Sequence, residues 1–166
     1  MSLALDGTNG LTFNNSTTQT SAGVVLQVAQ GIVTTGFSST STSFVTTGIT
    51  ATITPKFSTS KVLISYTFGG ACTNSFQTQI YKGGSTLSGA TGTTGANVST
   101  SLFIPQNSGS SGFYNVCSNY LDSPATTSAT TYAIYIKTDG GTFYFNTRSG
   151  TDFSGIATIT LLEIAA

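Results

Sequence analysis

Short stretches of β-forming residues recur along the chain from Val24 onward, and this recurrence limits the possible folds more than any other feature. The clearest stretch is KVLISYTF at 61–68, in which every second residue from Val62 to Phe68 is apolar, as expected for a strand with one buried face. Stretches of strand composition occur at 24–30, 43–47, 49–54, 61–68, 75–82, 98–104, 112–121, 130–137, 142–147 and 156–164. No stretch shows a helical period with caps. The sequence therefore predicts an all-β fold, an antiparallel, jelly-roll-like β-sandwich of about ten strands.

Turn residues separate these strands. Pro55 cannot donate a ladder hydrogen bond, so it is expected to end the strand before it. In KTDGGT at 137–142, Asp139 and Gly140 favour the positive φ angles of a tight turn, which predicts a hairpin between 130–137 and 142–147. Two polar, glycine-containing stretches, 83–97 and 105–112, are expected to form loops at which a binding surface could lie.

The N-terminal segment differs from the rest of the chain. Within 7–23, Leu11 and Phe13 are the only sizeable apolar residues among Gly, Asn, Thr and Ser. Such a segment cannot bury much surface by itself, so it is expected to be a tail or an arm that a neighbour orders. The predicted organisation is an extended N-terminal arm at 1–23 and one β-sandwich domain at 24–166.

The charge content is unusually low. Only 6 % of the 166 residues are charged, and five bases balance five acids, whereas an ordinary globular protein has roughly 25 %. Nucleic-acid binding requires several Lys or Arg residues to neutralise phosphates, so a nucleic-acid partner is not expected. Little electrostatic repulsion keeps copies of a neutral chain apart, which favours self-association.

The sequence carries no sign of export or membrane insertion. MSLALDGTNG has no basic residue before its short apolar piece, which Asp6 interrupts. No stretch approaches the roughly 18 uninterrupted apolar residues of a membrane helix. The chain is therefore expected to be made in a cytoplasm.

Several predicted strands are apolar on both faces. In 130–137, Tyr132 shares one face with Ile134 and Ile136, while Ala133 and Tyr135 share the other. Because a sandwich strand needs only one buried face, the second face is expected to be covered by another copy of the chain, with a trimer favoured. The residues predicted to form this interface are Tyr132, Tyr135, Phe143, Phe145 and Leu161.

The chain lacks most of the residues that catalysis requires. It has no histidine, which excludes Ser-His and Cys-His nucleophile pairs and His-containing zinc sites. A turn role is expected for Asp122 and Asp139, Glu163 lies near the C-terminus, and Asp152 has no assigned role. The sequence therefore predicts no enzyme activity, no catalytic residue, no metal site and no cofactor.

The two cysteines, Cys72 and Cys117, lie in separate apolar stretches. Buried, reduced thiols are the favoured interpretation for a chain without an export signal, and a disulfide is the alternative.

The stretch YLDSPATTSATTYAIYIKT at 120–138, with GGTFYFN and ITLLEIAA after it, resembles the C-terminal β domains of tailed-bacteriophage fibre and virion-surface proteins. The resemblance covers 24–166, including SFVTTGITATITPKFSTSKVLISY, and 7–23 is similar to stretches that precede such domains. It implies a homotrimeric β-sandwich knob on the virion, made in the host bacterial cytoplasm, whose partners are other virion proteins and a host surface glycan.

Under this resemblance, Leu11 and Phe13 are expected to dock the arm onto the particle. The loop residues expected to face outward and contact the host are Ser85, Thr86, Leu87, Thr91, Asn97, Gln106 and Asn107. Three tyrosines, Tyr81, Tyr114 and Tyr120, are candidates for stacking on sugar rings, with packing between strands as the alternative.

Three functions remain open at this stage. A tail fibre or receptor-binding component is favoured for host attachment, and a capsid decoration or head-fibre trimer is the alternative. A polysaccharide depolymerase is the remote alternative, since carboxylates are few and histidine is missing.

Overall fold

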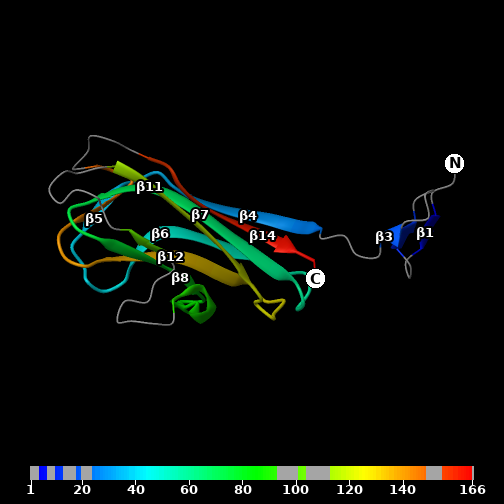
Figure 1. Cartoon of the computed structure of the whole chain (residues 1–166). Coiled ribbons are helices and arrows are strands. Elements are labelled where there is room, and N and C mark those ends of the chain that lie inside the picture. Colours follow the sequence, from blue (N-terminus) through cyan, green and yellow to red (C-terminus); the bar gives the residue numbers. More distant parts are fainter. Residues whose placement is uncertain are drawn as a thin grey trace.

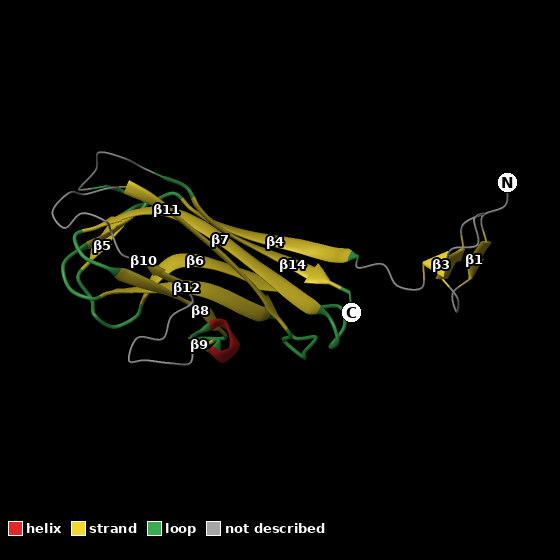
Figure 2. Ribbon diagram, in the orientation of Figure 1, coloured by secondary structure: helices red, strands yellow, loops and turns green. Residues whose placement is uncertain are grey.

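The fold is a β-sandwich, as the sequence predicts. The computed structural model describes residues 4–6, 10–12, 18–19, 24–92, 101–103, 113–148 and 155–165. Figures 1 and 2 show two layers of long strands, with the segment that contains β1–β3 at the N-terminal end. All the paired strands run antiparallel.

One layer is a five-stranded sheet. It consists of β10 (Ser101–Phe103), β8 (Phe76–Lys82), β12 (Thr130–Thr138) and β6 (Val45–Ile53) in that order, with the short β9 (Ser85–Thr86) paired to β8. A 3-10 helix, η1 (Ser88–Ala90), follows β9.

The other layer is a six-stranded sheet. It consists of β4 (Val25–Val33), β14 (Ala157–Ile164), β7 (Lys61–Cys72), β13 (Phe143–Phe145), β5 (Phe37–Ser39) and β11 (Phe113–Asp122). In this sheet β7 is central, because β14 and then β13 pair with one of its edges while β11 pairs with the other.

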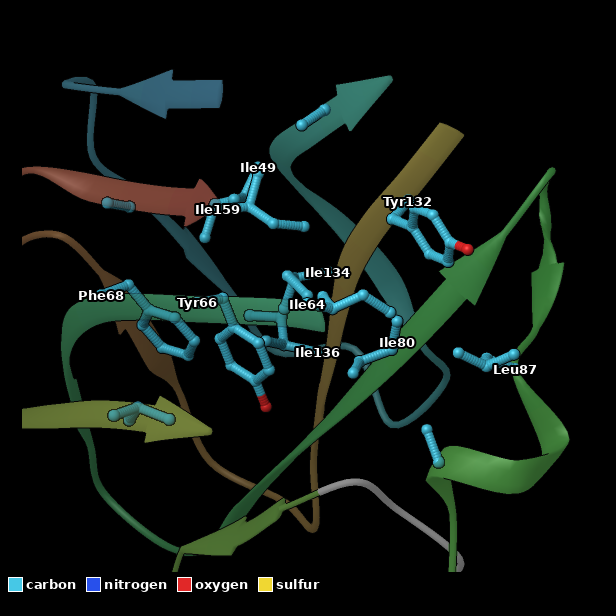
Figure 3. Close-up of a cluster of buried hydrophobic side chains, with 14 of the residues drawn as sticks. Ile49, Ile64, Tyr66, Phe68, Ile80, Leu87, Tyr132, Ile134, Ile136 and Ile159 are labelled. Carbon is cyan, nitrogen blue, oxygen red and sulfur yellow. The ribbon is translucent and has the colours of Figure 1, made fainter. Parts of the chain in front are cut away.

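The core lies between the two sheets. Alternate residues of β7, β12 and β14 point into it, and Figure 3 shows side chains from both sheets meeting there. An aromatic group packs within it, with ring centroids 5.3 Å apart for Phe68 and Phe145 and 4.5 Å apart for Phe76 and Phe143. The Tyr66 hydroxyl is 2.7 Å from Thr78 Oγ1, so a hydrogen bond joins the two sheets inside the core.

The edges of β4 and β6 meet along one side of the sandwich. A Cβ atom at Gly31 would lie 1.8 Å from the carbonyl oxygen of Thr50, so only glycine allows the two backbones to approach this closely. The stretches 43–47 and 49–54, which the sequence suggests as separate strands, form the single strand β6. Gly48 in β6 has φ +79°, and the pairing of β6 with β12 shifts register between Ala133 and Tyr135.

The prediction of a hairpin at 137–142 is wrong. β12 belongs to the five-stranded sheet and β13 to the six-stranded sheet, so this segment crosses from one layer to the other. It runs beside the β7–β8 connection, which also crosses between the layers, and hydrogen bonds join the backbones of Thr73 and Thr142 and of Ser75 and Asp139. The sequence predicts positive φ angles at Asp139 and Gly140, whereas the structure has them at Gly140 and Gly141. Local turn chemistry does not decide which sheet the next strand joins.

Part of the predicted N-terminal arm is structured. β1 (Ala4–Asp6), β2 (Gly10–Thr12) and β3 (Thr18–Gln19) form a three-stranded antiparallel sheet. Leu11 belongs to β2, where its backbone pairs with Leu5 and Gln19. Phe13 lies outside the described residues.

The predicted subunit interface is wrong for four of its five residues. Tyr132, Phe143, Phe145 and Leu161 have no exposed surface in a single chain, because they fill its own core. The outward faces of β12 and β14 mix polar and apolar residues, and these four residues belong to the inward-facing set. Tyr135, the fifth, points outward from β12 and is half-buried.

Candidate functional surface

The outer face of the five-stranded sheet carries a stacked pair of tyrosines. Tyr81 on β8 and Tyr135 on β12 have ring centroids 3.8 Å apart and ring planes 16° apart. They are diagonal neighbours, because Ala133 pairs with Tyr81 while Tyr135 pairs with Gln79. Both are half-buried and lie on the side of the sheet opposite the core. The pair therefore presents phenol groups at the protein surface from a rigid part of the sheet.

A glycine turn places hydroxyl groups beside this pair. Gly83 and Gly84 have φ angles of +58° and +83°, which suit a two-residue turn and allow β9 to fold back on β8. Thr86 thereby pairs directly with Tyr81, and Ser85 pairs with Lys82. The sequence contained the signal for this hairpin, since Gly83 and Gly84 directly follow the strand SFQTQIYK.

The residues predicted to face outward divide into four groups. Ser85 and Thr86 are exposed, as an outward role requires. Leu87 does not fit this role: it is only 7 % exposed and belongs to the core, near Ile80 in Figure 3. Thr91 is half-buried and donates a hydrogen bond to the Ser88 carbonyl. The other three, Asn97, Gln106 and Asn107, lie outside the described residues.

Polar groups near the pair are largely satisfied by the chain itself. Thr86 Oγ1 donates to Gln79 Oε1 over 3.4 Å, and Gln79 is nearly fully buried. Lys137 Nζ lies 5.3 Å from the ring centroid of Phe44, in cation–π geometry. The Asp139 carboxylate accepts hydrogen bonds from Ser75 and Gln77.

Asp122 has a different role from the turn residue that the sequence suggests. It ends β11 and is buried, and its Oδ2 accepts hydrogen bonds from Lys82 Nζ at 2.9 Å and from the Tyr132 hydroxyl at 2.6 Å. Burial raises the pKa of Tyr132, and the bond to Asp122 raises it further. Because β11 belongs to one sheet and β8 and β12 to the other, this ion pair connects the two layers.

Glu163 is buried at the end of β14. Gln27 Nε2 donates to Oε2 over 2.6 Å, and the backbone N–H of Lys56 donates to Oε1 over 2.7 Å. Burial by itself would raise the pKa of Glu163, but the hydrogen bonds, led by that of Gln27, outweigh burial and the pKa is lowered. The carboxylate thus holds the 54–60 turn against β4 and β14.

Three carboxylates of the sandwich have structural contacts. Asp122, Asp139 and Glu163 each accept hydrogen bonds from their own chain, and Asp152 lies outside the described residues. Within the part of the chain that the structure describes, no three His, Cys, Asp or Glu residues gather into a group that could hold a metal ion.

The two cysteines differ, contrary to the prediction that both are buried. Both are free thiols, but Cys72 is buried and Cys117 is exposed on the outer face of β11. Burial raises the pKa of Cys72 to about 11, so this thiol is a poor nucleophile near neutral pH.

The other tyrosines considered for sugar stacking lie elsewhere. Tyr114 and Tyr120 are both half-buried on β11, in the other sheet, and Tyr120 packs against the core. Sequence reasoning selected Tyr81 but missed its pairing with Tyr135, because that contact depends on the alignment of two strands more than fifty residues apart.

A stacked, half-exposed tyrosine pair next to exposed hydroxyls can bind a neutral ligand. Phenol rings offer apolar surface and polar tips, and threonine and serine hydroxyls both donate and accept hydrogen bonds.

No family model matches the chain, and no curated protein is significantly similar to it. Among the described residues, no helix is long and apolar enough to cross a membrane.

Proposed function

We propose that this chain is a non-catalytic, homotrimeric knob on the surface of a bacteriophage virion, where it acts as a tail fibre or receptor-binding component. The observation that carries the receptor-binding part is the Tyr81–Tyr135 pair beside Ser85 and Thr86. The ligand would be a neutral saccharide of the host surface, because sugars combine apolar ring faces with hydroxyl groups. The virion setting rests on the sequence resemblance.

The first test is a binding comparison with purified protein. Soluble wild-type protein should bind host cells and block adsorption of the phage, and the double variant Tyr81→Ala/Tyr135→Ala should lose both effects. Tyr144→Ala is the matched control, because Tyr144 is also half-buried but lies on β13 of the other sheet. Unchanged cell binding by a folded double variant would rule out the tyrosine pair as the receptor site.

The second test is the copy number of the chain in purified virions, measured by quantitative mass spectrometry against the major capsid protein. A low copy number would support a position on the tail. A copy number approaching that of the capsid protein would support capsid decoration instead. Absence of the chain from virions would contradict the proposed setting altogether.

A further inference from the structure

The outer face of the six-stranded sheet carries an apolar row that crosses four strands. Val28 on β4 pairs with Leu162 on β14, Leu162 pairs with Leu63 on β7, and Leu63 pairs with Leu121 on β11. Val28 is 59 % exposed and Leu121 is 46 % exposed, while Leu63 and Leu162 are half-buried. The row is therefore continuous across the sheet and open to solvent at both ends.

The exposed apolar residues of the molecule concentrate on this sheet. Eight large apolar side chains are exposed among the described residues. Five of them lie in β4 or β11, two directly precede β4 or β14, and only Phe57 lies in another segment. At the far end of the face, the Phe113 ring lies over Gly69, where an added Cβ would be 2.2 Å from the ring. This concentration is what marks an interaction surface rather than scattered apolar residues.

The next two rows of the face are uncharged and mostly polar. One row contains Gln30, Thr160, Ser65 and Asn119, and the row after it runs from Ile32 to Cys117 through Thr158 and Thr67. Amide and hydroxyl groups both donate and accept hydrogen bonds, so such a row can pair with an identical row.

The near absence of charged side chains on this face favours a second copy of the chain as the partner. The outward-facing residues of the four strands include one charged side chain, Lys61, which lies at the end of β7 and donates to Ser123. A charged partner would lose the hydration of its charges here without gaining a counter-ion. A second copy brings the same uncharged face and a net charge of zero, so no repulsion opposes the contact.

The size of the face agrees with this assignment. Four strands spaced by about 4.8 Å and about seven residues long give a flat footprint of roughly 450 Å². The protruding side chains make the accessible area larger, which brings it toward the roughly 800 Å² that each partner contributes to a standard interface.

We infer that the outer face of β4, β14, β7 and β11 is the surface through which copies of this chain associate. This inference names the contact for the proposed assembly and rests on the proposal that copies assemble, but it is independent of the virion setting. It replaces the sequence-predicted interface, of which only Leu161 lies on one of these four strands; on that strand, β14, the outward-facing Leu162 takes the place of Leu161.

The test combines assembly mass with the reactivity of Cys117. Purified full-length wild type should be oligomeric by light scattering over a dilution series, and iodoacetamide should label Cys117 slowly. Val28→Lys places an unpaired charge in the contact and should raise the dissociation constant by about 30-fold or more. Labelling of Cys117 should then become fast, while buried Cys72 stays unlabelled and reports that the chain is folded.

Two further variants make the result decisive. Phe57→Lys is the matched control, because Phe57 is 56 % exposed but lies off this face, and it should assemble like wild type. Leu121→Lys, at the other end of the row, should repeat the effect of Val28→Lys and replaces it if that variant does not fold.

Two outcomes would overturn the inference in different ways. If Val28→Lys and Leu121→Lys form the same oligomer as wild type with Cys117 reactive throughout, copies associate through another surface and the proposed trimer survives. If wild type is monomeric with Cys117 fully reactive, both the contact and the proposed assembly are wrong.

Discussion

The outer faces of the two sheets both carry large apolar side chains, but the chain covers them to different extents. On the five-stranded sheet the chain partly covers its own outward aromatics, since Tyr135 stacks on Tyr81, and Lys137 Nζ lies over the ring of Phe44, the residue before β6. On the six-stranded sheet, Val28 and Ile32 are each 59 % exposed. An apolar residue on an outer face is therefore no sign of an interface until its own neighbours have been accounted for.

The largest loss of stability is expected at Gly31 on β4, the strand that also carries the exposed Val28 and Ile32. Gly31→Val drives a side chain into the Thr50 carbonyl and should destabilise the fold by about 3 kcal/mol or more, since overpacking against backbone cannot relax easily. Urea unfolding measures the change. Gln30→Val, on the exposed neighbouring position, should change stability by less than about 0.5 kcal/mol, and equal effects would contradict the close β4–β6 contact.

The link between the two layers is tested at Asp122. Asp122→Ala leaves Lys82 without its ion-pair partner and the Tyr132 hydroxyl buried without an acceptor, and it should cost about 3 kcal/mol. Asp122→Asn keeps an acceptor for Tyr132 and should cost less. Denaturant midpoints measure both changes. A loss below about 0.5 kcal/mol for the alanine variant would show that Asp122 does not join the sheets.

Glu163 gives the six-stranded sheet a pH dependence. Its pKa is lowered in the folded state, so its stabilisation is fully present above the unfolded pKa of about 4.3 and is lost as the pH falls through the folded value. Glu163→Gln should lower the melting temperature at pH 7, and the gap to wild type should narrow below pH 4. Parallel thermal melts across this range measure it, and a gap that is constant with pH would contradict the lowered pKa.

The smallest effect is expected at the tyrosine pair. Single changes Tyr81→Ala and Tyr135→Ala and the double change form a cycle in which the coupling should be about 1 kcal/mol, as expected for a stacked aromatic pair. Unfolding free energies measure it. A coupling near zero would mean that the two rings do not cover each other, and the two outer faces would then be alike.

The sequence by itself determined the all-β sandwich and most of the strands. The period of two in 61–68 and the lack of helical period are local properties, and a strand pattern needs one buried face whatever its partner is. The neutral surface and the missing histidine are likewise properties of composition. Local patterns also located the positive φ angle at Gly140, although its neighbour with positive φ is Gly141 and not Asp139.

Tertiary structure alone decided which face points where and which strands meet. Tyr132 and Tyr135 look equally suited to an interface in sequence, yet one fills the core and the other stacks on Tyr81. The segment 137–142 reads as a hairpin, yet β12 finds its partners in β6 and β8, and β13 finds them in β5 and β7. The physical reason is that strand pairing and side-chain burial depend on segments far apart in the chain, about which a local pattern carries no information.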